Sequence, residues 1–194
     1  MLSAREFAYA LYGAYRLARL DRHGMVYFEA TIEGFWRSFY AAVVVAPGYM
    51  VLVLLRLDEG PADVGWLRIS LVEAIAYVIG WVAFPLAVFY LARAIDRSEE
   101  YIGYIVAYNW AQVLQIGLLL PATAASVGGL VPSRLGALLG FMVMVAILFY
   151  QWFIARTALG VAAVVAAGLV LLDLVLGGVI GLIAGHMIRP GAGT

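Results

Sequence analysis

Long runs of apolar residues alternate along the chain with short polar segments. A helix needs about 20 apolar residues to cross a hydrocarbon layer of about 30 Å, because each residue adds about 1.5 Å. Five stretches approach or exceed this length, and we expect each to form a membrane-spanning helix. They cover residues 38–55, 66–95, 101–123, 135–154 and 158–188. The pattern therefore predicts an all-α fold, a polytopic membrane helix bundle of about five transmembrane helices.

The links between these spans are short, and the last of them is the shortest. Residues 155–157 are the only polar interruption between the fourth and fifth spans. These two spans therefore form either a tight hairpin or one bent rod. Pro47 and Pro85 lie inside the first and second spans, where we expect kinks rather than helix ends.

The segment before the first span has helical amphipathic periodicity instead of a continuous apolar run. At 100° per residue, Phe7, Leu11 and Leu17 fall on one side of a helix. The opposite side is cationic and carries Arg5, Arg16 and Arg19. We expect this helix to lie on the membrane surface among the lipid headgroups. The alternative is that it packs on the protein's own loops.

A second amphipathic stretch follows and leads into the first span. Within it, Glu33 and Arg37 are four residues apart, which favours a surface ion pair worth a few tenths of a kcal/mol. The expected organisation is a cytoplasmic interfacial region at 1–37, a transmembrane domain at 38–188 and a short tail at 189–194.

Composition supports lipid as the solvent of most of this surface. The chain is 65% hydrophobic and 12% charged, whereas soluble domains are about 25% charged. Twelve basic and twelve acidic residues leave no net charge, so a nucleic-acid partner is not expected. The expected partners are the lipid bilayer and, as a further possibility, a second copy of the chain or another membrane protein.

The arginines are distributed unevenly between the two ends of the predicted bundle. Eight lie on the side of the N-terminus: Arg5, Arg16, Arg19, Arg22, Arg37, Arg93, Arg97 and Arg156. Four lie on the other side: Arg56, Arg68, Arg134 and Arg189. Short loops rich in arginine stay in the cytoplasm, so we predict a cytoplasmic N-terminus and a C-terminus outside.

Asp173 is the sharpest candidate for a functional group. It lies near the middle of the last hydrophobic stretch, where a carboxylate costs at least about 2.5–3.5 kcal/mol on insertion scales. It is either a proton or cation site, or a hydrogen-bonded group that ties two helices together. A break in the helix near Gly177 and Gly178 would instead place it at a shallower level.

The third span carries a polar stripe, which should face protein or a water-filled cavity. Its members are Tyr101, Tyr104, Tyr108, Gln112 and Gln115, with Asn109 at the flank. Interhelical hydrogen bonds by the two glutamines are the simplest interpretation, and a polar pathway is the alternative. Glu73 is expected close to the outer interface, snorkelling or meeting Arg68. Gln151 is expected at the inner interface.

Gly177, Gly181 and Gly185 form a glycine ridge at a spacing of four residues, which lets a second helix approach closely. We expect the ridge to pack inside the chain, and a second copy is the alternative. No catalytic template is present, and the two histidines, His23 and His186, lie on opposite predicted sides. The chain has no cysteine. No enzyme activity, metal site or cofactor is therefore expected.

The order of segments resembles the Yip1-domain superfamily, in which a cytoplasmic segment precedes five closely spaced hydrophobic helices. Residues 34–55 (GFWRSFYAAVVVAPGYMVLVLL) are similar to the entry into the first helix of small bacterial proteins of this type. Residues 149–173 (FYQWFIARTALGVAAVVAAGLVLLD) resemble their last two helices. The resemblance implies a location in a bacterial cytoplasmic (inner) membrane. The DLYGP and GYP signatures of eukaryotic members are absent, so no site residue carries over.

Two functions follow from these features. The first is a membrane-organising or protein-interaction component without catalytic chemistry. The second is a small transporter or channel subunit that uses Asp173 and the polar face of the third span.

Overall fold

A computed structural model describes residues 2–57 and 65–188, and the tail predicted at 189–194 lies outside this range. The described part is helical throughout, without strands. Its elements are α1 (Ala4–Ala18), the 3₁₀ helix η1 (Arg22–Tyr27), α2 (Ile32–Ser38), α3 (Tyr40–Leu57), α4 (Trp66–Ala94), α5 (Tyr101–Val127), α6 (Ser133–Leu159) and α7 (Ala163–Ile188). Five spans are long and apolar enough to cross a membrane, which confirms the predicted all-α bundle.

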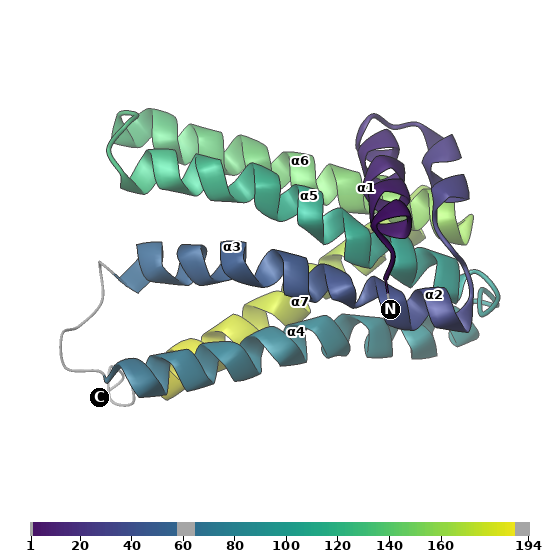
Figure 1. Cartoon of the computed structure of the whole chain (residues 1–194), viewed down its shortest axis with the longest axis horizontal. Helices are drawn as coiled ribbons and strands as arrows, with labels where there is room; N and C mark the ends of the chain where they lie inside the picture. Colours follow the sequence, from purple (N-terminus) through teal and green to yellow (C-terminus); the bar gives the residue numbers. More distant parts are fainter. Residues whose placement is uncertain (1, 58–64, 189–194) are drawn as a thin grey trace.

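The spanning helices form two groups that meet at one end of the molecule. Helices α3, α5 and α6 pack side by side, while α4 packs mainly on α7 (Figure 1). The groups come together where α5 begins and α6 ends, next to α1 and α2, and diverge toward the opposite end (Figure 1). We call these the α1 end and the far end of the bundle.

The main core lies at the α1 end. Every residue of α5 from Gly103 to Ala111 is buried, because α1, α2, α3, α4 and α6 all contact this helix. A second, smaller cluster lies at the far end between α4 and α7. It consists of Ile69, Val72, Ala184 and Ile188.

Several helix boundaries differ from those expected, and two of them bear on how the spans are connected. The first span begins at Ile32 rather than at residue 38, because α2 runs into α3 with only Phe39 between them. Helix α6 continues through the expected link at 155–157 and ends at Leu159. Gly160 then takes the left-handed conformation (φ 61°), which reverses the chain without the steric cost that a Cβ would add. The fourth and fifth spans are thus separate helices, and the bent rod is excluded.

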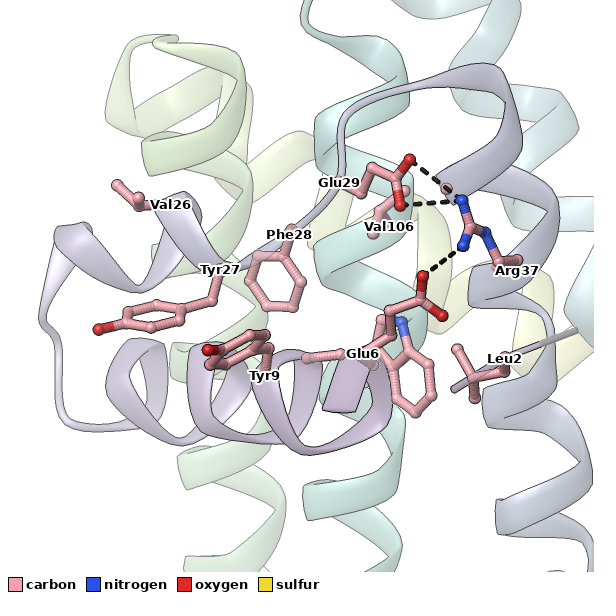
Figure 2. Close-up of a pocket in the computed structure, with 12 residues that line it drawn as sticks. Leu2, Glu6, Tyr9, Val26, Tyr27, Phe28, Glu29, Arg37 and Val106 are labelled. Carbon is pink, nitrogen blue, oxygen red and sulfur yellow. Dashed lines mark hydrogen bonds and ion pairs between the residues drawn. The ribbon is translucent and has the colours of Figure 1, made fainter. Parts of the chain in front are cut away.

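The N-terminal helix begins with a capping box and packs across the bundle. The Ser3 hydroxyl accepts a hydrogen bond from the backbone N–H of Glu6, and the Glu6 carboxylate accepts one from Ser3. Figure 2 shows α1 crossing the spanning helices at a steep angle. The Tyr150 hydroxyl on α6 donates a 2.7 Å hydrogen bond to the carbonyl of Ala14.

The apolar face of α1 is buried in the protein rather than in lipid. Ala14 and Leu17 have no exposed surface, and Phe7 meets Trp110 of α5 edge to face with ring centroids 5.5 Å apart. Burying a leucine side chain contributes about 1.5–3 kcal/mol. Whether the helix also lies at the level of the lipid headgroups stays a prediction. The alternative, packing on the protein itself, describes the structure, and only the cationic face points outward.

Candidate functional site

Asp173 lies at the junction of α5, α6 and α7, where both of its carboxylate oxygens are engaged. The Tyr108 hydroxyl donates to Oδ1 at 2.8 Å, and the amide of Gln151 donates to Oδ2 at 3.0 Å. None of the ion pairs in the described part of the chain involves Asp173. The carboxylate is thus held by two neutral donors and not by a cation.

Two glutamines of the polar stripe lie beside this group. The Gln151 amide also approaches the carbonyl oxygen of Gln115 at 3.4 Å, and Gln115 is buried. Gln112 lies one turn before Gln115 and interacts with the hydroxyl of Tyr108. The structure therefore brings together four side chains that we call the Asp173 cluster: Asp173, Tyr108, Gln151 and Gln115.

Asn109 belongs to a different polar group on the neighbouring face of α5. Its amide donates a 2.8 Å hydrogen bond to the hydroxyl of Ser38, which in turn donates to the carbonyl of Phe35 at 2.7 Å. Both Asn109 and Ser38 are fully buried. This chain of bonds fixes the junction of α2 and α3 to α5.

Two buried polar atoms of α5 have no hydrogen-bond partner among the described residues. They are the side-chain oxygen of Asn109 and the amide nitrogen of Gln115. An unsatisfied buried polar group costs about 1–3 kcal/mol. The polar stripe therefore has hydrogen-bonding capacity that the described contacts do not use.

The level of Asp173 in the bundle follows from the helix positions. Tyr108 is seven residues from the start of α5, and Gln151 is eight from the end of α6, so each lies about 10–12 Å from the α1 end. Helix α5 is about 40 Å long, so Tyr108 and Gln151 lie about halfway between the α1 end and the middle of the bundle. Helix α7 runs unbroken through Gly177 and Gly178, so the expected alternative of a helix break does not occur.

Glu73 takes no part in this cluster and does not meet Arg68. Its carboxylate accepts a 2.7 Å hydrogen bond from the Tyr49 hydroxyl, which joins α4 to α3. The guanidinium of Arg68 instead donates to the backbone carbonyl of Met187 at 2.9 Å, near the end of α7. Gln151, expected at the interface, is buried instead.

The glycine ridge of α7 does not pack inside the described chain. A Cβ atom built on Gly177, Gly181 or Gly185 would meet no atom within 4 Å. All three positions are exposed. The expected intramolecular contact is therefore not found among the described residues, and the alternative of a second copy stays a prediction.

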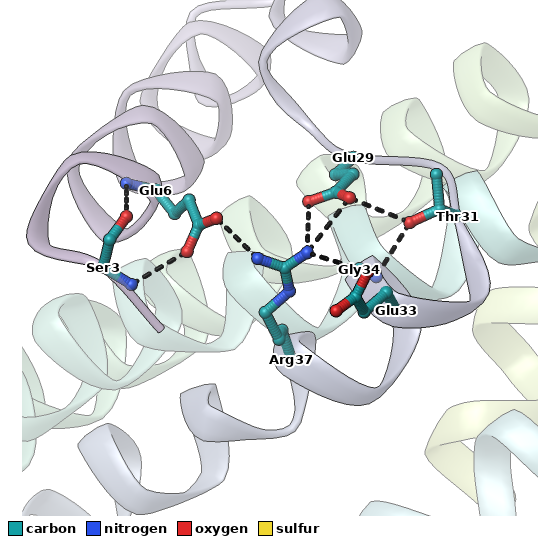
Figure 3. A network of polar contacts seen from close by, with 7 residues as sticks. All are labelled: Ser3, Glu6, Glu29, Thr31, Glu33, Gly34 and Arg37. Carbon is teal, nitrogen blue, oxygen red and sulfur yellow. Dashed lines mark hydrogen bonds and ion pairs between the residues drawn. The ribbon is translucent and has the colours of Figure 1, made fainter. Parts of the chain in front are cut away.

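At the α1 end, Arg37 connects α1, α2 and the segment between them. Its guanidinium lies 2.5 Å from Glu6, 3.1 Å from Glu29 and 3.7 Å from Glu33 (Figure 3). The pair of Glu33 and Arg37 is the one predicted from their spacing. Three carboxylates share one guanidinium, so this ion-pair network is negative as a whole.

The charges on α1 and η1 also perturb the ionisation of their carboxyl groups. The hydrogen bond from the Ser3 backbone, assisted by Arg37, holds the pKa of Glu6 below its ordinary value. The Arg16 guanidinium and the backbone N–H of His23 lower the pKa of Asp21 in the same way. Both carboxylates are therefore charged partners of α1 at neutral pH.

The described residues contain no group of three or more metal-ligating side chains. Comparison with family models, curated proteins and solved structures finds no match to this chain. These comparisons do not bear on the resemblance to the Yip1-domain superfamily, which stays a prediction. Fold and composition define the class as an all-helical membrane protein with five apolar spans.

Proposed function

We propose that this chain is a membrane-organising or protein-interaction component whose N-terminal unit, residues 2–39, presents a recognition surface. The observation that carries the proposal is the difference between the two faces of α1. Its apolar face is buried against α5 and α6, so the opposite face points outward.

That outward face pairs arginines with half-exposed tyrosines. The guanidinium of Arg5 lies 5.2 Å from the ring centre of Tyr9, and that of Arg19 lies 5.8 Å from the ring centre of Tyr15. Tyr12 is exposed between them. We call these five residues the arginine–tyrosine face. Tyrosine and arginine are enriched in protein interfaces, and they also suit the headgroup layer of a membrane.

The Asp173 cluster supports the same function as an internal tie. Its carboxylate is satisfied by Tyr108 and Gln151, and neither the cavity beside α1 nor the one beside Arg68 is lined by a residue of the cluster. Hydrogen bonds from α5 and α6 to one carboxylate on α7 restrain the platform that carries α1.

Co-purification from native membranes tests the proposal. We expect the double variant R5Q/R19Q to lose partners that the wild type retains, because it removes both exposed guanidiniums. The matched control is R134Q, which removes an exposed arginine at the far end. Identical partner profiles for all three proteins would contradict an interaction role for this face.

A second function, a small transporter or channel subunit, is favoured by one observation. Asp173 has no cationic partner in the described part of the chain, and the unsatisfied amide of Gln115 belongs to the same cluster. Flux of protons or cations into vesicles that contain the purified protein would support it, with D173N abolishing the flux. The control is E73Q, which removes a carboxylate outside the cluster. Absence of flux in the wild type would eliminate this function.

A further inference from the structure

A cavity of about 250 Å³ lies inside the N-terminal unit, separate from the Asp173 cluster. Its walls come from α1, from residues 26–29 and from α2, and Val106 and Trp110 of α5 contribute to its lining (Figure 2). This volume is smaller than the roughly 300–1,000 Å³ of sites for drug-sized ligands. It suits a chemical group of a few heavy atoms.

Aromatic rings form much of the cavity lining. Tyr9, Tyr27, Phe28 and Trp110 all contribute, and the rings of Tyr9 and Tyr27 are 6.2 Å apart between centroids. The face of an aromatic ring is negative and attracts cations. Two guanidiniums outside the cavity lining already use this property, since Arg5 lies over Tyr9 and Arg16 lies 5.5 Å from the centre of Tyr27.

The charged side chains of the lining favour a positive ligand. They are Glu6, Glu29 and Arg37, and Arg37 is held by both of these carboxylates and by Glu33 outside the cavity (Figure 3). The three carboxylates around Arg37 therefore outnumber its single positive charge. The Glu29 carboxylate also accepts a 3.0 Å hydrogen bond from the Thr31 hydroxyl, and nearly half of the Glu29 side chain is exposed.

We propose that this cavity binds an organic ammonium group, in a free amine or in the headgroup of a phospholipid. The carboxylate of Glu29 would supply the opposite charge, and the rings of Tyr9 and Tyr27 would supply the negative faces. An anionic ligand would meet the excess of carboxylates. The proposal shares Tyr9 with the arginine–tyrosine face, but it depends on the cavity and not on Arg5 or Arg19.

The first test uses tetramethylammonium chloride as the probe. Titration into the full chain in phosphatidylglycerol nanodiscs, which contain no ammonium lipid, should give saturable binding in the millimolar range; sodium chloride at the same concentration should not. E29Q should weaken binding about tenfold. E33Q should leave it unchanged within about twofold, because Glu33 shares the same guanidinium but does not line the cavity. Absence of saturable binding, or equal losses in both variants, overturns the proposal.

A second pair of variants tests the aromatic wall without touching the ion pairs. Tyr9 and Tyr15 lie on the same helix, are 45% and 49% exposed and each stack with an arginine, but only Tyr9 lines the cavity. Y9L should weaken binding severalfold and Y15L should not. This pair decides the matter even if E29Q loosens the N-terminal unit. Equal affinities for the two variants would contradict the proposal.

The source of the ammonium group is tested in mixed nanodiscs. If a phospholipid headgroup occupies the cavity, adding phosphatidylethanolamine or phosphatidylcholine should compete with tetramethylammonium, and Y9L should reduce the amount of that lipid retained on purification. If a free amine is the ligand, tetramethylammonium should bind equally well in all three lipids. Either result supports the ammonium site, whereas competition by an added lipid without an ammonium group, such as phosphatidic acid, would contradict it.

Discussion

The hydroxyl of Tyr108 donates a 2.8 Å hydrogen bond to Asp173, 65 positions further along the chain. This bond joins α5 to α7, and Gln151 adds α6 to the same carboxylate. Interhelical hydrogen bonds inside membrane proteins contribute about 0.6 kcal/mol on average and up to about 1.7 kcal/mol. These polar contacts add to the apolar packing between the two helix groups, since Phe84 and Val88 of α4 and Leu169 of α7 share one core with α5 and α6.

Removing the Tyr108 hydroxyl should weaken this junction. We expect Y108F to lower the free energy of unfolding by about 1 kcal/mol, because one oxygen of Asp173 then loses its donor. Thermal unfolding in detergent measures the change. Y104F is the control, since Tyr104 lies one turn earlier, is equally buried and does not bond to Asp173. Equal stability of Y108F and the wild type would show that the bond contributes nothing.

Glycine at position 34 is required by a close approach to the backbone. A Cβ atom there would lie 2.1 Å from the carbonyl oxygen of Glu29, which cannot move aside as a side chain can. We expect G34A to destabilise the N-terminal unit by at least about 1–3 kcal/mol. G80A should be neutral or stabilising by up to about 1 kcal/mol, because open space surrounds Gly80 and alanine favours a helix. Limited proteolysis of both variants gives the comparison.

Acid should loosen the docking of α1. The pKa of Glu6 is depressed in the folded protein, so its carboxylate stabilises the fold above its ordinary pKa of about 4.5. That contribution is lost as the pH falls below this value and Glu6 takes up a proton. The protection factors of the α1 amides, which are exchange rates corrected for the intrinsic pH dependence of amide exchange, should therefore fall below about pH 4.5. E6Q should have lower protection factors at neutral pH and a weaker pH dependence, whereas E33Q should keep the wild-type dependence.

The glycine ridge offers a test of self-association. Because open space surrounds Gly181 within the described chain, G181L should leave the stability of a single chain unchanged. If a second copy packs on the ridge, the leucine should shift the protein toward monomers in cross-linking experiments. L182A, at an exposed neighbouring position, is the control. An unchanged oligomeric state would remove the ridge as a contact between copies.

The spans could be predicted from the sequence because hydropathy depends only on local composition. The polar stripe of α5 could be predicted as well, since helical periodicity places Tyr108 and Gln115 on one face. The partner of that stripe could not, because it depends on how α6 and α7 turn. With Gly160 recognised as the turn, Gln151 lies nine positions before it and Asp173 thirteen after it, which would have suggested that they meet.

Local sequence pattern also could not predict what covers the apolar face of α1. An apolar face with arginines opposite has the same periodicity whether lipid or protein covers it. Tertiary contacts place this face against the protein. The Tyr150 hydroxyl donates to the carbonyl of Ala14, and the Trp110 ring packs against Phe7. Neither contact has a signal in the sequence of α1 itself.

The small cluster of Ile69, Val72, Ala184 and Ile188 is separate from the main core. We therefore expect the far end of the bundle to be less stable against local unfolding than the α1 end. Because the two clusters share no residue, we expect local opening to begin at the paired tips of α4 and α7, before the aspartate junction opens. Thickness fluctuations of the surrounding bilayer would thus be absorbed at the far end, before they reach the buried carboxylate.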